Sequence, residues 1–332
     1  MEAVSVENSL VARALATAPS GVFINGTWRE ARGDGEFDVI NPATGNVITR
    51  VADADAEDGL AALEAAAAAQ ESWARTAPRA RAELLRNLFE IVVERAEEFA
   101  VLMTIEMGKP VAEARGEVAY GAEFLRWFSE EAVRLNGRYS MTPEGSLRVI
   151  TMPRPVGPVL AITPWNFPHM GEACNAANRF YVSRELVDEF AARLAAEFEG
   201  LVVGDGLDLA TDIGPIITSG QRQRLRELVK RARERGARVL TGGEDVTGPG
   251  YFYRPTVLTV ADPGDPVVCE ELFGPVAPVV PFDSEEQVLT WANSSPVGLA
   301  AYVHTGDIDR ALRMSERLEV GMTGINSAAI SN

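Results

Sequence analysis

The alternation of apolar and polar residues predicts that the chain opens with short antiparallel strands and continues into a helix. Between residues 21 and 50, short apolar runs such as Val22–Ile24 are separated by turn signals such as Asn25–Gly26, a pattern typical of strands joined by tight turns. The alanine-rich stretch that follows predicts a helix to about Trp73, and the acidic residues at 53–57 can cap its start.

Two longer helices are expected next. Pro78 is a suitable first residue for a helix that continues through Met107. A third helix is expected from Pro110 to about Leu135, because Asn136–Gly137 is a typical C-terminal stop. Within the first of these two helices, five apolar residues fall on one stripe, as a core-facing helix requires: Leu84, Leu88, Ile91, Val92 and Phe99.

The rest of the chain predicts an α/β fold. A strand is expected at Arg148–Met152, and the run Gly157–Thr163 is almost entirely apolar, as expected of a parallel strand buried on both faces. Strands and helices then alternate in the second half, which predicts an α/β domain there. These elements are a strand after Arg179, a helix at 185–197, a helix at 219–235, a strand at Val239 and further strands up to Phe282.

The junction between the two halves is too short for a nucleotide-binding sheet. Consecutive parallel strands need a crossover of about a dozen residues or more, usually with a helix. Only Pro164–Asn178 intervenes here, with two prolines in it, and the sequence contains no Gly-x-Gly-x-x-Gly or Walker-type phosphate loop.

Composition and charge narrow the class of protein. The chain has 332 residues, of which 46% are hydrophobic and 24% charged, as in a globular protein of two domains. Its 48 acidic and 31 basic residues give a formal charge of −17, which disfavours binding to nucleic acids and to anionic membranes. The basic run Arg222–Arg238 contains Leu225, Leu228 and Val229 at helical spacing and is interpreted as the solvated face of a helix.

Few residues suit a disulfide framework or a metal site. Cys174 and Cys269 are the two cysteines, and the two histidines are His169 and His304, so neither disulfides nor a metal ion is expected. No signal-peptide pattern opens the chain and no apolar stretch approaches the length of a membrane span. A cytoplasmic location is therefore expected.

The turn Gly171–Asn175 is the candidate for nucleophilic chemistry. Cys174 lies in this turn of small residues just before a predicted strand, and Asn166 is an amide donor eight positions earlier. A nucleophilic thiol needs activation and a donor for the oxyanion that forms on the attacked carbonyl. From the residues alone, a buried structural cysteine is an open alternative, and this is our interpretation of Cys269. Likewise Trp165 can close a core, and Glu270–Glu271 can be a solvated pair before a tight turn.

Several separated stretches resemble, in this order, the aldehyde dehydrogenase superfamily. They are Asn41–Gly45, Gly157–Val159, Pro-Trp-Asn-Phe-Pro at 164–168, Gly-Glu-Ala-Cys at 171–174, and Glu-Glu-Leu-Phe-Gly-Pro-Val at 270–276. Weaker similarity includes 106–110, 212–216 and 321–326, so the resemblance covers nearly the whole chain. Within the superfamily, the residues around Cys174 look most similar to succinate-semialdehyde dehydrogenases.

The resemblance implies a role for each matching residue. Cys174 would attack the aldehyde to give a thiohemiacetal, and hydride would then pass to NAD or NADP. Asn166 and the backbone N–H of Cys174 would hold the oxyanion. The family also implies a small aldehyde substrate and a homo-oligomer. The implied cofactor contacts are Thr163 through its backbone, Trp165 beside the cofactor and the cysteine turn, Glu271 on the nicotinamide ribose and Phe273 beside the nicotinamide ring.

The chain departs from the family after Pro168. The family carries a long stretch there that supplies most of its dinucleotide-binding sheet, whereas this chain has His169–Met170 before Gly171. Contacts to the adenosine ribose, the pyrophosphate-binding helix start and the general-base glutamate belong to that stretch. The chain also stops at Asn332, before the family's last segments. We therefore expect an aldehyde-dehydrogenase-like α/β fold with an incomplete dinucleotide-binding domain and a largely retained catalytic domain.

The expected domains follow from this departure. Residues 1–170 would form the N-terminal part with the remnant of the cofactor domain, residues 171–326 the catalytic domain with cofactor contacts near 270–276, and residues 327–332 the start of a shortened C-terminal segment. Strand edges left uncovered predict poor solubility or altered self-association.

Three functions remain open at this point. The chain is an aldehyde dehydrogenase that oxidises an aldehyde such as succinate semialdehyde to a carboxylic acid with NAD(P)⁺, a catalytically inactive deletion remnant, or a weak thiol esterase that uses no cofactor. Cofactor binding separates the first from the others. Burst release from an activated ester with labelling of Cys174 separates the third from the second.

Overall fold

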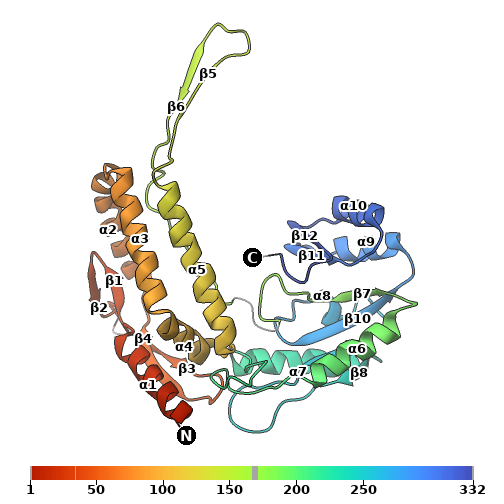
Figure 1. The fold of residues 1–332 in the computed structure, drawn as a ribbon. Helices are drawn as coiled ribbons and strands as arrows, with labels where there is room; N and C mark the ends of the chain where they lie inside the picture. The colour runs from red at the N-terminus through yellow and green to blue at the C-terminus, as the bar shows by residue number, and fades with distance from the viewer. Residues whose placement is uncertain (1, 34, 167–170, 331–332) are drawn as a thin grey trace. The chain divides into compact units, whose positions relative to one another are not determined.

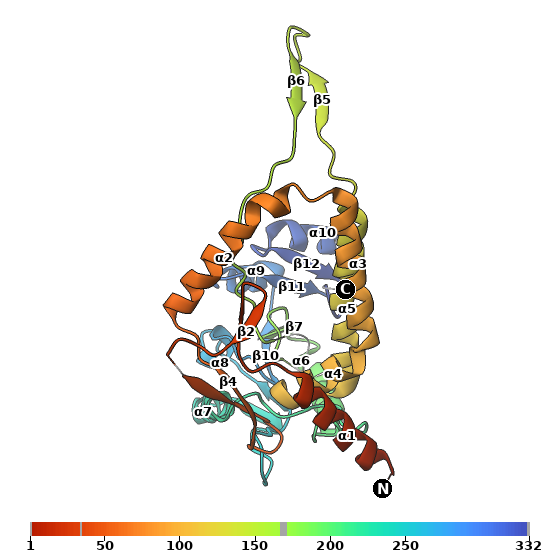
Figure 2. The same ribbon diagram turned by 90° about the vertical axis from the view of Figure 1, so that its left-hand side faces the viewer.

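The computed structural model describes residues 2–33, 35–166 and 171–330, which form two compact units (Figures 1 and 2). Unit 1 comprises Met1–Ile40, Val47–Leu102 and Arg115–Pro164. Unit 2 comprises Asn41–Asn46, Met103–Ala114 and Trp165–Asn332. This division differs from the domains expected from the sequence, because two N-terminal segments and the residues from Trp165 onward belong with the catalytic half.

The first strands of unit 1 confirm the predicted antiparallel opening. Strand β1 (Val22–Ile24) pairs with β2 (Thr27–Arg29), and β3 (Glu36–Ile40) pairs with β4 (Val47–Ala52). Asn25 and Gly26 both have positive φ, 52° and 80°, which is the conformation that a two-residue turn between strands requires. A helix that the sequence analysis did not predict, α1 (Glu2–Thr17), precedes them.

The helices of unit 1 begin where the capping residues predict. Asp55 caps α2 (Ala56–Ala74) by accepting hydrogen bonds from the backbone N–H groups of Glu57 and Asp58. Three helices follow: α3 (Pro78–Glu94), α4 (Ala96–Met107) and α5 (Val111–Glu131).

The single helix predicted for residues 78–107 is broken at Arg95. This residue has φ −100° and ψ 17°, outside the helical range, and its backbone N–H bonds to the carbonyls of Ile91 and Val93. Its guanidinium forms an ion pair at 2.7 Å with Glu98 in the first turn of the next helix. A carboxylate in that position favours a new helix start, because the helix dipole is positive there.

The apolar stripe predicted to face the core is exposed instead. On α3, the side chains of Leu84, Leu88 and Ile91 are 54%, 45% and 49% exposed, and Phe99 on α4 is 37% exposed. The spacing of the apolar residues correctly indicates helices, and it also indicates a face that needs an apolar partner. No element in the described part of the chain covers this stripe.

The strand predicted at Gly157–Thr163 is absent from the described structure. These residues have no regular secondary structure, and Val159, Leu160 and Ile162 are 77%, 84% and 88% exposed. A buried parallel strand needs hydrogen-bonding neighbours, and no described segment pairs with this one. The preceding strand prediction is confirmed by β6 (Arg148–Thr151), which pairs with β5 (Arg138–Met141) in a hairpin that projects away from the helices of unit 1 (Figures 1 and 2).

Unit 2 contains a four-stranded sheet with the order β7-β10-β9-β8. Strand β10 (Val276–Phe282) pairs in parallel with both β7 (Phe180–Ser183) and β9 (Thr256–Thr259). Strand β8 (Arg238–Thr241) pairs antiparallel with β9 at the edge. The predicted α/β character of the second half is confirmed.

Helices cover both faces of this sheet. Residues of α7 (Ser219–Glu234) pack in one buried cluster with Leu258, Val276 and Val280, whereas residues of α6 (Val187–Glu199) pack in another with Val257, Ala277 and Val279. Because neighbouring residues of β9 and β10 point to opposite faces, α6 and α7 lie on opposite sides. The charged residues of the basic run thus lie around a helix whose Leu225, Leu228 and Val229 are buried, as predicted.

The C-terminal part of unit 2 adds a small parallel pair of strands. Strand β11 (Ala300–Val303) pairs with β12 (Met322–Ile325), and helices α9 (Glu285–Asn293) and α10 (Ile308–Arg317) pack with it around Leu289, Val303 and Met314. A short helix, α8 (Pro266–Cys269), joins β9 to the loop before β10. Among the described residues, no helix is both long and apolar enough to cross a membrane.

Candidate active site

The turn that carries Cys174 has the local structure that the sequence predicted. The backbone N–H of Ala176 bonds to the carbonyl of Ala173 at 3.1 Å, and β7 begins four residues later. The Cys174 side chain is exposed. Gly171 has φ +80°, and a Cβ there would overlap the carbonyl of Gly274, so the turn packs tightly against the loop before β10.

A tyrosine from β11 lies beside this turn. The hydroxyl of Tyr302 donates a hydrogen bond of 2.8 Å to the carbonyl of Asn175. Burial raises the pKa of Tyr302, and the negative charge of a Cys174 thiolate raises it further. The sequence analysis missed Tyr302, because nothing in the sequence near it indicates a contact more than a hundred residues away.

Glu172 is a buried carboxyl two residues before the nucleophile candidate. Its side chain is fully buried, and Oε1 accepts a hydrogen bond of 3.3 Å from the backbone N–H of Ile217. Burial raises the pKa of Glu172 to about 8, and the Ile217 hydrogen bond opposes this only in part. Glu172 is therefore mostly protonated at neutral pH and connects the cysteine turn to the segment before α7.

Asn166 offers a donor that nothing in the described structure uses. Its Nδ2 atom is buried and donates to no acceptor among the described residues. A buried amide donor without a partner costs roughly 1–3 kcal/mol, so such groups are rare outside functional sites. An oxyanion formed on a bound carbonyl compound would satisfy it.

Two nearby segments, at Trp165 and at Gly171, contact Phe273 and Gly274 about a hundred residues further along the chain. The rings of Trp165 and Phe273 are 5.5 Å apart in an edge-to-face arrangement of 79°. Gly171 packs against Gly274, the next residue of the same loop. Trp165, next to Asn166, and Gly171, three residues before Cys174, therefore contact adjacent positions of one loop.

Three side chains hold the loop Glu270–Gly274 by its backbone. Asn178 accepts from the N–H of Leu272 at 2.7 Å and donates to the carbonyl of Glu270 at 2.8 Å. These contacts fix the positions of Glu271, which is exposed, and Phe273, whose φ is +52°. The remaining contacts come from α7: Gln221 Nε2 donates to the carbonyls of Leu272 (2.7 Å) and Phe273 (2.8 Å), and Arg224 donates to the carbonyl of Glu271 (2.7 Å) and to the Glu270 carboxylate (3.0 Å).

The predicted cofactor residues are divided between the two units of the chain. Trp165, Glu271 and Phe273 belong to unit 2, and Trp165 and Phe273 are in contact. Thr163 belongs to unit 1, in the exposed segment that was predicted to be a strand. Trp165 and Phe273 are thus the predicted cofactor residues for which the structure shows a direct contact.

The N-terminal ends of the described helices of unit 2 are poor binding sites for the pyrophosphate of NAD(P). A phosphate binds at a helix start when its N–H groups are free and no acidic side chain lies nearby. Four of these starts are capped by their own side chains, from Thr218, Asp265, Ser284 and Asp307. The starts of α5 and α6 carry Glu113 and Asp188–Glu189 in their first turns. A complete NAD(P) therefore does not fit the residues present.

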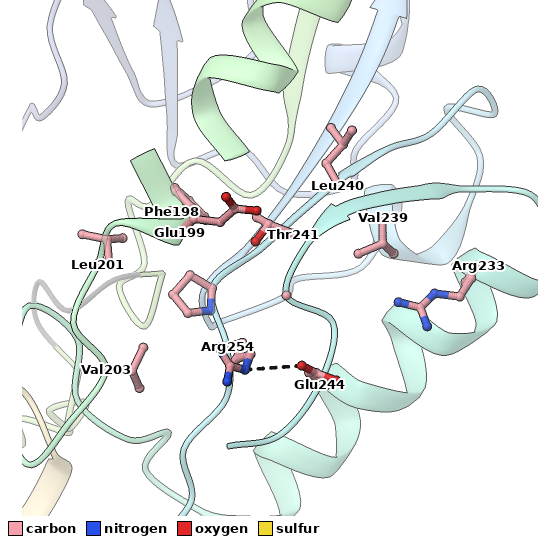
Figure 3. A pocket seen from close by; sticks show the side chains of 12 residues that line it. Phe198, Glu199, Leu201, Val203, Arg233, Val239, Leu240, Thr241, Glu244 and Arg254 are labelled. Carbon is pink, nitrogen blue, oxygen red and sulfur yellow. Dashed lines mark ion pairs between the residues drawn. The ribbon is translucent and has the colours of Figure 1, made fainter. Parts of the chain in front are cut away.

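A separate hollow of about 440 Å³ lies beside the antiparallel edge of the sheet (Figure 3). Its lining includes Phe198, Leu201, Val239 and Leu240, and the Arg254 and Glu244 that border it form an ion pair at 3.4 Å. None of the residues predicted for catalysis or cofactor binding lines it. We therefore place the candidate active site at the cysteine turn.

Comparison with known families identifies the family of the chain. The sequence model for the aldehyde dehydrogenase family matches the chain twice, over residues 28–170 and over residues 169–332. The two matches meet where the sequence analysis located the missing stretch.

Individual relatives and a solved structure extend the comparison. A succinate-semialdehyde dehydrogenase from Paenarthrobacter nicotinovorans is 38% identical over 411 aligned positions, which cover 86% of this chain and 91% of the relative. A 3-sulfolactaldehyde dehydrogenase from Pseudomonas putida is 30% identical over 434 positions, covering 93% and 89%. The crystal structure of an NADP-dependent enzyme from E. coli superimposes with a TM-score of 0.90 at 29% identity, covering 95% of this chain and 91% of that one.

The alignment lengths measure the missing stretch. In the alignment with the Paenarthrobacter relative, 86% of the chain, about 286 residues, occupies 411 positions, which leaves about 125 positions opposite a gap. The alignment with the Pseudomonas relative gives the same value, because about 309 residues occupy 434 positions. The expected deletion is therefore confirmed.

Proposed function

The chain belongs to the aldehyde dehydrogenase family, and from this premise we propose that it retains the nucleophile half of the family's active site without a working hydride acceptor. In this proposal Cys174 attacks the carbonyl carbon of an aldehyde. The observation that carries the proposal is the convergence of the Cys174 turn and the Trp165–Asn166 segment on the loop at Phe273–Gly274, with an unused buried donor on Asn166.

The addition step needs only residues of this chain. The sulfur of Cys174 forms a bond to the carbonyl carbon, the π electrons move to the carbonyl oxygen, and that oxygen takes up the proton lost from the thiol. The product is a thiohemiacetal. Asn166 Nδ2 would donate to the oxygen as its negative charge develops, together with the Cys174 backbone N–H. Because Gly171 packs against Gly274, the thiol approaches the carbonyl from a turn of fixed position.

Two relatives suggest the class of aldehyde. Their names refer to succinate semialdehyde and to 3-sulfolactaldehyde. Both compounds are small aldehydes with an anionic group, a carboxylate or a sulfonate, at the end opposite the carbonyl. We propose that the aldehyde captured here belongs to this class, with succinate semialdehyde as the first compound to test.

The oxidation that completes the family's reaction needs NAD(P)⁺, which accepts the hydride when it is bound. Trp165, Glu271 and Phe273 would hold its nicotinamide end. The described helix starts of unit 2 provide no place for its pyrophosphate. We therefore propose that the isolated chain captures aldehydes but does not oxidise them.

Protection of Cys174 from alkylation tests this proposal. Both cysteines are exposed, so the burial expected for Cys269 is wrong, and Cys269 is an internal control for general reactivity. We expect succinate semialdehyde to slow the labelling of Cys174 by iodoacetamide at least tenfold and to leave that of Cys269 unchanged, as read by peptide mass spectrometry. Equal labelling of the two cysteines with and without the aldehyde would remove Cys174 from the role of nucleophile.

The same assay addresses the esterase alternative. An activated ester such as p-nitrophenyl acetate would acylate Cys174 once and release one equivalent of nitrophenol. Deacylation would be slow without a general base near the acyl group. We expect a stoichiometric burst in the unmodified chain and none in Cys174→Ser, whereas sustained turnover would favour an esterase.

A further inference from the structure

Unit 1 has an apolar hollow that no described segment fills. The hollow measures about 490 Å³ and lies between the end of α2, one face of α3 and the end of α5. The apolar residues that line it are Trp73, Leu84, Leu85, Leu88, Ile91 and Ala132. Trp73 is 48% exposed and the three residues of the stripe are 45–54% exposed, so a stripe suited to a protein core faces solvent here.

The same unit carries a strand-like segment without a neighbour. Residues 157–163 include Val159, Leu160 and Ile162, each more than three quarters exposed. No backbone hydrogen bond joins residues 153–163 to another segment within the described ranges. Consecutive apolar residues are typical of a parallel strand covered on both faces, so this segment is suited to pairing with strands and to packing beneath helices.

Both features occur in a chain from which a defined piece is missing. The two family matches meet at residues 169–170, and the two alignments each leave about 125 positions opposite a gap. A piece of that length is within the range of an independent domain. In this chain the two ends of the gap are joined by a short connection, because Asn166 and Gly171 are five residues apart, at most about 18 Å of extended chain. Close ends are typical of a domain that can fold as a separate chain.

We propose that unit 1 is a docking surface for a separate polypeptide of about 125 residues that corresponds to the missing segment. This partner supplies strands that pair in parallel with residues 157–163. It also supplies apolar side chains that fill the hollow lined by Leu84, Leu88 and Ile91. The inference does not depend on the proposed chemistry of Cys174, because it concerns another unit and a binding reaction without substrate or cofactor.

A second copy of this chain is a poorer occupant. Each copy carries a formal charge of −17, so two copies repel one another. A copy also presents the same unpaired segment and the same empty hollow. The gap in the alignments points to a different polypeptide.

Co-expression tests the proposal. The probe is the segment of the Paenarthrobacter relative that aligns opposite the gap, produced as a separate tagged polypeptide together with the full 332-residue chain. We expect the two to co-purify as a 1:1 complex by analytical ultracentrifugation. In that complex, the backbone amides of residues 157–163 should exchange with deuterium at least tenfold more slowly than in the chain alone.

A matched pair of variants locates the surface. Leu84→Glu places a charge in the hollow, whereas Leu312→Glu places one on α10 of unit 2 at nearly the same exposure, 54% against 53%. We expect Leu84→Glu to weaken the complex at least tenfold and Leu312→Glu to leave it unchanged, with both variants as stable as the unmodified chain in thermal denaturation.

Three results would overturn the proposal. The first is failure of the segment to co-purify with a folded chain. The second is equal binding by the two glutamate variants. The third is a homodimer of this chain in which residues 157–163 are already protected from exchange, since the surface would then serve self-association. Each result is independent of whether Cys174 captures an aldehyde.

Discussion

Asn166 and Glu172 lie on either side of the junction, and each buries a polar group in a way that protein interiors rarely tolerate: Asn166 is half-buried with a buried Nδ2 atom, and Glu172 is fully buried. The Nδ2 atom of Asn166 has no acceptor among the described residues, and the Glu172 carboxyl is buried with a strongly raised pKa. Such groups reduce the stability of the fold, so they occur mainly where a function requires them. Both lie within eight residues of Cys174, which supports the placement of the site at this turn.

Asn166→Ala should separate function from stability. Removing the amide also removes a buried donor without a partner, so the free energy of unfolding should stay the same or rise by up to about 1 kcal/mol. Protection of Cys174 by succinate semialdehyde should weaken at least tenfold, because the oxyanion loses a donor. Denaturation and alkylation rates measure the two effects. A variant that unfolds more readily and still captures the aldehyde normally would contradict the assigned role.

Glu172→Gln should change how stability depends on pH. Because the pKa of Glu172 is raised to about 8 in the folded chain, from an ordinary value of 4.5, the protonated form is favoured on folding. The stability gained from keeping the Glu172 carboxyl protonated is fully present below about pH 4.5 and is lost as the pH rises toward 8. The neutral glutamine avoids this loss, so the variant should gain stability over the unmodified chain between pH 6 and pH 9 in urea denaturation. The same pH dependence in both proteins would contradict the assignment.

The order of the family-like motifs along the chain identified Cys174, Asn166, Trp165 and Phe273 as candidate site residues. In the structure, the segments around Trp165 and Gly171 contact the loop at Phe273–Gly274. The roles themselves stay predictions until they are measured. Tyr302 and Gln221 could not be found in this way. Their contacts with the site join residues 51 or more positions apart, and no local pattern encodes such a contact.

At the scale of helices and strands, prediction from the sequence is limited in a second way. Periodicity predicted α2, α5, α6 and α7, and it predicted α3 and α4 as one helix across the break at Arg95, but it did not predict α1, α8, α9 or α10. It also predicted the strands of the four-stranded sheet, up to β10, but not β11 or β12. It failed on burial for α3 and on structure for residues 157–163. In both places the pattern specifies a partner that this chain does not contain, so a helix keeps an exposed apolar face and a potential strand remains unpaired.

Two leucine-to-alanine variants compare the exposed apolar face of α3 with the buried apolar face of α7. Leu225 is fully buried on α7, and Leu88 on α3 is 45% exposed. Leu225→Ala should cost about 2–5 kcal/mol of unfolding free energy, whereas Leu88→Ala should cost less than about 1 kcal/mol. Urea denaturation of both variants provides the comparison. An equal and large loss for Leu88 would mean that its stripe is covered in solution by the chain itself or by a second copy.

The loop that carries Glu271 and Phe273 is held by Asn178 and by two side chains of α7, Gln221 and Arg224. Gln221→Ala leaves the carbonyls of Leu272 and Phe273 without the donor that both now share. We expect a loss of about 1–2 kcal/mol in the free energy of unfolding. Amide exchange in residues 270–274 should also become faster. Gln223→Ala, on the exposed side of the same helix, is the control and should change neither quantity.

For the whole molecule, the order of motifs along the chain revealed the missing segment, which composition and charge do not show. A chain with 46% hydrophobic residues and a normal proportion of charges looks complete by those measures. The alignments confirm a gap of about 125 positions. A homo-oligomer and a cytoplasmic location remain predictions.

Calorimetric titration of the purified, folded chain with NAD⁺ and with NADP⁺ tests the central claim most directly. We expect no saturable heat and no rise in melting temperature with either dinucleotide, because no described helix start of unit 2 suits the pyrophosphate. Aldehyde protection of Cys174, measured on the same sample, would show that the nucleophile is competent. Saturable binding of either dinucleotide to the isolated chain, with a matching increase in stability, would contradict the claim that hydride transfer has lost its acceptor.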